Sequence, residues 1–238
     1  MATQATDEFA PILPGKGESD YERYLRTDDL LELQKSPEER AHHDELLFQT
    51  VHQSSELWLK LAWSEVEVAT DHLRKHELDP ALRLLRRSVD CLKIVHSLLD
   101  MLEHMAPWEY TRWIRPVLGH GSGFDSPGFN GVRRVSPDLG EAFHALRREQ
   151  GLSVVELYQR GREFEQLYQL AELMIEWDER VTLWRMRHYK VIARIIGDEV
   201  VGTQGTPVEL LGGLIKQRVY PELWTARNEL TELAKQED

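Results

Sequence analysis

The chain has 238 residues, of which 41% are hydrophobic, a single cysteine, and a formal net charge of −12 at pH 7. This length allows one large globular domain or two small ones, with a sizeable core. The acidic balance argues against nucleic-acid phosphates or anionic membranes as the main partner, and one cysteine excludes an intramolecular disulfide.

Residues 1–19 are polar and contain Pro11, Pro14, Gly15 and Gly17, which predicts a flexible arm with little structure of its own. They hold no apolar stretch typical of a signal peptide. No run in the chain approaches the roughly 20 apolar residues that cross a bilayer. We therefore expect a cytoplasmic protein with no membrane partner.

Apolar residues spaced in steps of three and four predict helices over most of the remaining chain. Thr27 and Asp28 suit the start of a first helical stretch, and Ser136 with Pro137 suits the start of a short helix. Further helices are expected over about 42–78, 81–105, 108–114, 153 onward, 162–196 and 208–234, the last with a break near 220. We see no useful strand pattern and no domain-boundary signal, so residues 20–238 are predicted to form one all-α domain.

Two glycine-rich segments interrupt the helical pattern, GHGSGFDSPGFNG at 119–131 and VVGTQGTP at 200–207. Glycine allows positive φ and close approach of backbones, so both segments are predicted to be loops. An ordinary connection between helices would explain them. However, they contain Ser122 and Thr203, whose hydroxyls could contact a small ligand.

Two histidines occupy apolar helix faces, His188 one turn after Trp184 and His52 one turn after Phe48. A core histidine hydrogen-bonded to a neighbour is the ordinary explanation of such a position. Imidazole is also the commonest metal ligand in proteins. The cluster His42-His43-Asp44-Glu45 is a weaker metal candidate, because adjacent helical residues point about 100° apart. Periodicity and spacing alone therefore identify no cofactor.

Four segments carry a more specific signal: YERYLRTDDLL at 21–31, HHDELLFQTVHQSSELWLKL at 42–61, RPVLGHGSGF at 115–124 and WRMRHYKVIARIIG at 184–197. The second segment is similar to the pattern HDE-x-LF-x-x-x-HQ-x-SELW-x-K of the tryptophan 2,3-dioxygenase family. The other three resemble, in the same order, that family's N-terminal substrate segment, its Ser-Gly-Phe loop and its haem-ligand helix. The resemblance covers most of the chain.

The resemblance implies a helical bundle that encloses a b-type haem, with both glycine-rich loops over the distal pocket. His188 matches the proximal ligand of the haem iron. Trp184 and Arg185 are expected beside the haem, where the arginine would suit a propionate. His52 matches the distal histidine that receives a hydrogen bond from the indole N–H, and Phe48 matches a wall of the indole pocket.

The resemblance also implies how the substrate is held. Arg115 matches the residue that pairs with the substrate carboxylate, a geometry suited to a guanidinium group. Ser122 and Thr203 match loop groups near the haem and the substrate ammonium. Tyr21 and Tyr24 match residues that the family contributes from a neighbouring subunit of a homotetramer.

The chain departs from the family pattern in both loops and in length. The stretch between Phe124 and His188 is much shorter than in the usual enzyme. Asp125-Ser126-Pro127-Gly128 replaces a Gln and Tyr/Arg-rich sequence, and the second loop reads Val201-Gly202-Thr203-Gln204-Gly205 where Gly-Thr-Gly-Gly is expected.

From the resemblance we expect a haem-dependent enzyme that inserts O₂-derived oxygen into the indole ring of L-tryptophan or a derivative. The simplest reaction is 2,3-dioxygenation to N-formylkynurenine. One alternative is a monooxygenase that converts a modified tryptophan to an oxindole in secondary metabolism. Two others are a haem sensor or carrier without turnover and a structural helical protein without haem.

Overall fold

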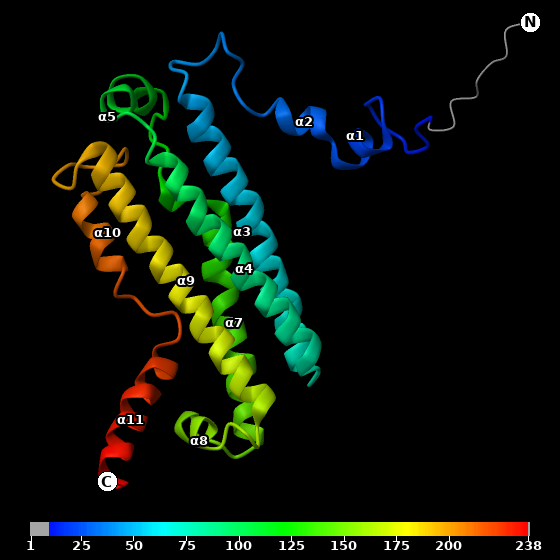
Figure 1. Ribbon diagram of the computed structural model, residues 1–238, viewed down its shortest axis with the longest axis vertical. Coiled ribbons are helices and arrows are strands. Elements are labelled where there is room, and N and C mark those ends of the chain that lie inside the picture. The colour runs from blue at the N-terminus through cyan, green and yellow to red at the C-terminus, as the bar shows by residue number, and fades with distance from the viewer. Residues whose placement is uncertain (1–9, 238) are drawn as a thin grey trace, which may run out of the picture.

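Long helices dominate the computed structural model, which describes residues 10–237. They lie side by side as a bundle of α3 (Glu45–Arg74), α4 (Leu78–Leu102), α7 (Pro127–Glu149) and α9 (Glu165–Ile196), seen in Figure 1. In the described part of the chain the only β feature is an isolated bridge between Val201 and Pro207. The predicted all-α class is confirmed.

Buried apolar residues on the facing sides of the four helices form the core, as their spacing predicts. The larger cluster fills the middle of the bundle and contains Trp177, whose indole N–H donates to Ser136 Oγ at 3.1 Å. A smaller cluster lies where α3 begins and α9 ends, and it includes Val51, Ile114 and Val191. This smaller cluster supports the backbone next to His52.

Helix α7 begins earlier than the sequence predicts. The expected loop at 119–131 ends at Ser126, whose hydroxyl accepts the Phe129 N–H at 3.1 Å and caps α7. The prediction of a helix opening at Ser136–Pro137 is therefore wrong, because Pro137 lies inside α7. Its missing N–H is tolerated because tertiary contacts hold this turn, including the Tyr220 hydroxyl, which donates to Ser136 O at 3.0 Å.

The glycines that suggested a long loop instead serve helix packing. Gly128 and Gly131 lie on α7 against α3. A Cβ at Gly128 would lie 2.6 Å from the Cβ of Leu59, and one at Gly131 would collide with the Trp63 ring. The two helices can approach this closely only because these positions have no side chain.

Shorter helical elements connect or flank the bundle: α1 (Asp20–Leu25), α2 (Thr27–Leu31), α5 (Pro107–Glu109), the π-helix η1 (Tyr110–Ile114), α6 (Arg115–Val117), the 3₁₀-helix η2 (Gly123–Asp125), α8 (Val154–Gln159), α10 (Val208–Leu214) and α11 (Pro221–Glu237). The sequence analysis missed α1, although Ser19 and Glu22 form a capping box at its start.

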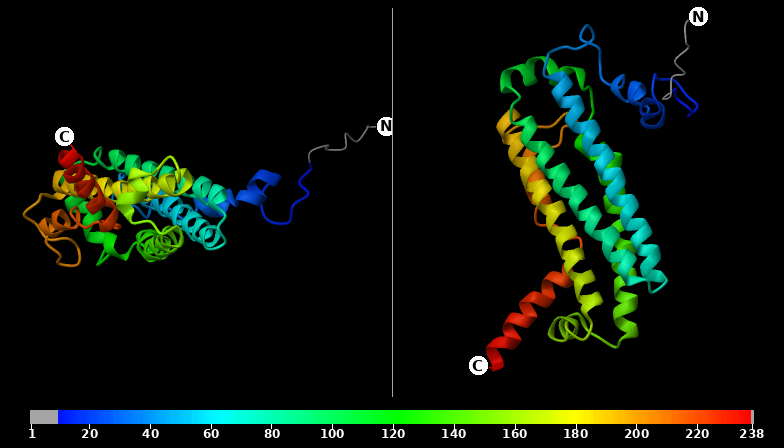
Figure 2. Two further views of the ribbon diagram at one scale, coloured as in Figure 1. Left: turned by 90° about the horizontal axis from the view of Figure 1, so that it is seen from below. Right: turned by 45° about the vertical axis from the view of Figure 1, so that its right-hand side comes forward.

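Both ends of the described chain extend away from the bundle. Figure 2 shows α1 and α2 projecting beside one end and α11 beside the other. Residues 12 and 13 donate backbone hydrogen bonds to Asp20, so the segment before α1 is attached to it, while residues 1–9 of the predicted arm lie outside the described residues. Across residues 10–237, no helix combines the length and apolar character required of a membrane span.

Candidate functional site

The imidazole of His188 lies against aromatic rings near the end of α9. It stacks on Trp184 with ring centroids 4.6 Å apart and an interplanar angle of 13°, and Trp184 in turn packs on Phe129 at 3.8 Å. No hydrogen bond involves either ring nitrogen of His188 among the described residues. Stacking, rather than a hydrogen bond, therefore sets the plane of this ring.

His188 is neutral at pH 7, and Gly123, which has no side chain, lies beside its Cε1 and Nε2 atoms. Burial, with a contribution from the nearby His52, lowers the pKa of His188 to about 4. A Cβ at Gly123 would lie 3.7 Å from the Cε1 atom and 3.9 Å from the Nε2 atom of His188. A neutral imidazole with a free lone pair is the form that binds a metal ion.

His52 lies on α3, close enough to His188 for the charge of one ring to affect the other. Its Nδ1 atom is 2.7 Å from Phe48 O. A carbonyl oxygen only accepts, so Nδ1 carries the hydrogen, and the neutral ring presents Nε2 as an acceptor. Desolvation by surrounding protein lowers the pKa of His52, although its side chain is accessible to solvent. This combination is typical of a residue that lines an open recess.

Aromatic rings continue from His52 towards Arg115. Phe48 stacks on His52 with centroids 4.0 Å apart, and Tyr110 lies 6.1 Å from Phe48. Burial raises the pKa of the Tyr110 hydroxyl, and the positive charge of Arg115 lowers it in part. Tyr110 therefore belongs to the same region as Phe48 and Arg115.

The two glycine-rich loops contact each other beside Arg115. The Nη2 atom of Arg115 donates to Val201 O at 2.5 Å, and the hydroxyl of Thr203 donates to Gly121 O. Ser122 caps η2 and precedes Gly123, which lies beside His188. The structure thus brings together Arg115 and both loops, as the sequence analysis expects of a substrate site.

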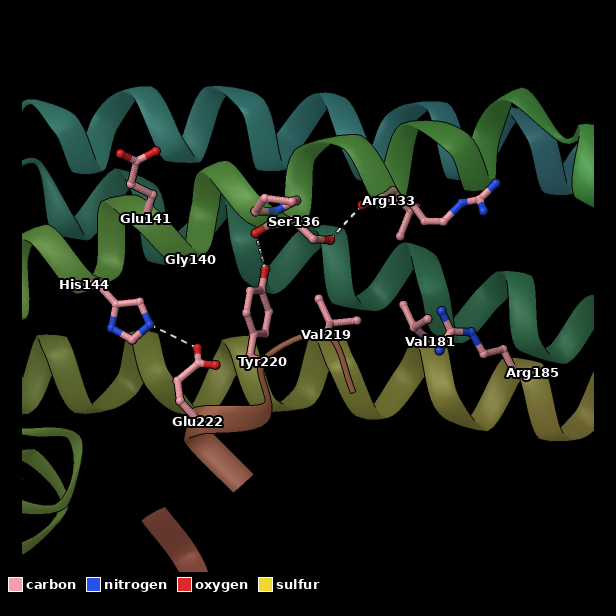
Figure 3. A pocket seen from close by; sticks show the side chains of 12 residues that line it. Arg133, Ser136, Gly140, Glu141, His144, Val181, Arg185, Val219, Tyr220 and Glu222 are labelled. Carbon is pink, nitrogen blue, oxygen red and sulfur yellow. Dashed lines mark hydrogen bonds and ion pairs between the residues drawn. The ribbon is translucent and has the colours of Figure 1, made fainter. Parts of the chain in front are cut away.

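Arg185 lines a different hollow, shown in Figure 3. Its Nη1 atom donates to Leu214 O at 3.2 Å and Gln217 O at 2.9 Å. The hollow has a volume of about 390 Å³, with Arg185 towards one end and the hydrogen-bonded pair of His144 and Glu222 at the other. Neither His52 nor His188 lines it. The structure does not bring the Arg185 guanidinium to the His188 ring.

Tyr21 and Tyr24 lie on α1, outside the bundle, with 68% and 77% of their surfaces exposed. Figure 1 shows α1 separated from the end of α9 that carries His188. Within one chain, therefore, these tyrosines do not join the candidate site.

The sequence analysis missed Tyr110, Gly123 and Phe129. The sequence did not indicate that Tyr110 lies near Arg115, because η1 is a π-helix. In it, the Arg115 N–H donates to Tyr110 O five residues earlier. Ordinary helical spacing does not place residues five apart on one face. Gly123 and Phe129 lie in a segment predicted to be a loop. In a loop, the spacing of residues along the sequence does not indicate which side chains they contact.

Comparisons with known proteins show which family the chain resembles. The sequence model of a family described as Tryptophan 2,3-dioxygenase matches residues 13–144. Proteins named Tryptophan 2,3-dioxygenase from Bacillus cereus (strain ZK / E33L), Caulobacter vibrioides and Myxococcus xanthus are each 30% identical to this chain. The three alignments cover 88%, 88% and 90% of this chain and 92%, 98% and 91% of those proteins.

The alignments with these relatives extend over 261 to 266 positions, more than the 238 residues of this chain. The relatives therefore contain segments that this chain lacks, in agreement with a shortened member. Because the family match covers more than half of the chain and the relatives align over nearly all of it, the chain belongs to the tryptophan 2,3-dioxygenase family.

Proposed function

We propose that this protein is a haem-dependent oxygenase that inserts O₂-derived oxygen into the indole ring of L-tryptophan, by 2,3-dioxygenation to N-formylkynurenine. The observation that carries the proposal is the protonation and hydrogen-bonding form of two neighbouring imidazoles, His188 and His52. His188 is neutral and free to bind a metal, and His52 offers an acceptor nitrogen suited to an indole N–H. The family, named for tryptophan 2,3-dioxygenase, supports the choice of substrate.

The residues around His188 suit a haem iron. A neutral His188 would hold the iron, the stacked Trp184 fixes the plane of its ring, and Gly123 places no side chain beside its Nε2 atom. When bound, haem supplies the binding and activation of O₂. The role expected of Arg185 at a propionate stays a prediction, because its guanidinium lines the separate hollow.

Five side chains would orient the substrate. His52 Nε2 accepts the indole N–H, and the rings of Phe48 and Tyr110 enclose the indole face. Arg115 uses one N–H on Val201 O, so its other donors remain for a bidentate bond to the substrate carboxylate. Thr203 donates its hydroxyl hydrogen to Gly121 O and keeps its lone pairs for the substrate ammonium.

His52 is a poor proton acceptor, because desolvation lowers its pKa. An electron-rich indole does not require a strong base. The work of this chain is therefore to position the ring and to keep water away from it, with the two loops as the cover.

Mass spectrometry of the product formed under ¹⁸O₂, by the haem-reconstituted protein with tryptophan, tests the proposal. We expect two labelled atoms in one product. One labelled atom in an oxindole, with modified tryptophans as better substrates, would instead identify a monooxygenase. A ferrous–O₂ complex that persists with tryptophan present would identify a sensor or carrier, and no Soret band after reconstitution would exclude haem.

A further inference from the structure

Asp125 joins the two glycine-rich loops. Its Oδ2 atom accepts the Ser122 N–H at 3.1 Å and the side-chain amide of Gln204 at 2.7 Å. Ser122 and Asp125 form the capping box of η2, and Gly123 between them lies beside His188. One carboxylate therefore sets the conformation of the first loop and binds the tip of the second.

The second loop is closed at its base by two backbone hydrogen bonds. Val208 N–H donates to Val200 O at 3.0 Å, and Gly202 N–H donates to Thr206 O at 2.8 Å. Beyond these bonds and the one from Leu210 N–H to Pro207 O at the start of α10, the described hydrogen bonds from the loop to the rest of the chain are those with Arg115, Gly121 and Asp125. Two of the three are to backbone carbonyls, and only the one between Gln204 and Asp125 joins two side chains.

Both members of this pair stand where the chain departs from the family pattern, Asp125 at the start of the replaced segment and Gln204 where a glycine is expected. The two departures contact each other across 79 positions of sequence. A bond from an amide to a carboxylate is stronger than one between neutral groups, because the acceptor is charged.

We propose that Asp125 and Gln204 are positioning residues, which hold the loop 200–207 over Arg115 so that both loops cover the substrate. This inference rests on the proposed function. The pair acts through the loop backbone and through Arg115, which contacts Val201 of the same loop. Loss of the bond between Gln204 and Asp125 should therefore weaken substrate binding more than it slows the reaction of bound substrate.

The variant Gln204→Ala removes the pair and leaves the capping of Ser122 in place. We expect the KM for tryptophan to rise about three- to tenfold with a smaller change in kcat, since a lost charged hydrogen bond at an exposed site corresponds to up to about tenfold in affinity. In hydrogen exchange without substrate, the amides of 200–207 should exchange faster than in the wild type.

Gln166→Ala is the matched control, because Gln166 donates to Asp79 Oδ1 at 2.6 Å, the same chemistry far from the site. It should leave KM and loop exchange unchanged. Gln204→Glu places two carboxylates together and should be worse than Gln204→Ala. The double variant D125N/Q204E removes the repulsion between two carboxylates and keeps an amide oxygen to cap Ser122, so its KM and exchange should lie closer to the wild type than those of Gln204→Glu.

Unchanged exchange of 200–207 in Gln204→Ala, or a double variant no better than Gln204→Glu, would overturn the pairing. A kcat loss with unchanged KM would overturn the positioning role. Hydrogen exchange needs neither haem nor turnover, so an inactive wild type would contradict the proposed function alone and the exchange comparison would still decide the pair.

Discussion

Single residues in the site take their chemical form from local hydrogen bonding. The bond from His52 Nδ1 to Phe48 O leaves Nε2 as an acceptor, and desolvation keeps the ring neutral. In the same way, burial keeps His188 neutral, with its pKa at about 4. In the proposed function these forms suit different partners, an indole N–H for His52 and a metal for His188.

Replacing His52 with alanine should slow tryptophan turnover by about one to two orders of magnitude, yet leave measurable activity. Loss of one orienting hydrogen bond in a partly buried site costs roughly 1–3 kcal/mol. 1-Methyltryptophan, which has no indole N–H, should be a poorer substrate than tryptophan for the wild type and nearly equal to it for His52→Ala. Steady-state rates for both substrates and both proteins measure this.

Retention of haem and substrate in His52→Ala, with no turnover at all, would contradict the orienting role and indicate an essential base. The Soret spectrum and its response to tryptophan serve as the control. Both should persist in the variant, because His188 lies on another helix.

At the scale of elements, contact between α3 and α7 places the site. Close packing at Gly128 and Gly131 brings the start of α7 against α3, and Glu56 on α3 accepts the Gly128 N–H at 2.7 Å. The Ser126 hydroxyl also donates to Glu56, at 2.5 Å. These contacts hold the end of the first loop, and therefore η2 and Gly123, next to α9.

Gly128→Ala should lower the free energy of unfolding by about 1–3 kcal/mol, because its Cβ would meet the fully buried Leu59. Gly212→Ala is the control. It also lies inside a helix, with no atom within 4 Å of an added Cβ, and should be neutral or gain up to about 1 kcal/mol. Urea denaturation followed by circular dichroism measures both. Equal effects of the two substitutions would show that α7 can move away from α3.

At the scale of the whole molecule, residues 12–33 form a segment whose apolar side chains are exposed in a single chain. The exposed side chains along it are Ile12, Tyr21, Tyr24, Leu31 and Leu33. Figure 2 shows α1 and α2 extending from the bundle. Exposed apolar surface of this kind is typical of an interface between protein chains.

We expect a homotetramer in which Tyr21 and Tyr24 reach the site of a neighbouring subunit. Sedimentation of the full chain should give four times the chain mass. Replacing both tyrosines with alanine should weaken tryptophan binding, while the Soret spectrum of the bound haem stays unchanged. A fully active monomer in analytical ultracentrifugation would be incompatible with this assembly.

The sequence by itself determined the all-α class, the long helices and the two histidines on apolar helix faces. Apolar residues three and four apart define a helix and its buried side wherever the helix packs. This is why α3, α4 and α9 lie close to their predicted ranges. The family motifs added candidate roles for residues such as Arg115, whose guanidinium does lie at the meeting of the two loops.

Only the tertiary structure decided the role of Gly128, the neighbours of Arg185 and the pair formed by Asp125 and Gln204. A glycine in the sequence does not show whether its role is to permit a loop or to let two helices pack closely. The direction of a long arginine side chain depends on segments 29 to 32 residues away. The bond between Asp125 and Gln204 joins loops 79 positions apart. Local spacing carries no information about such contacts, because packing of the whole bundle brings the partners together.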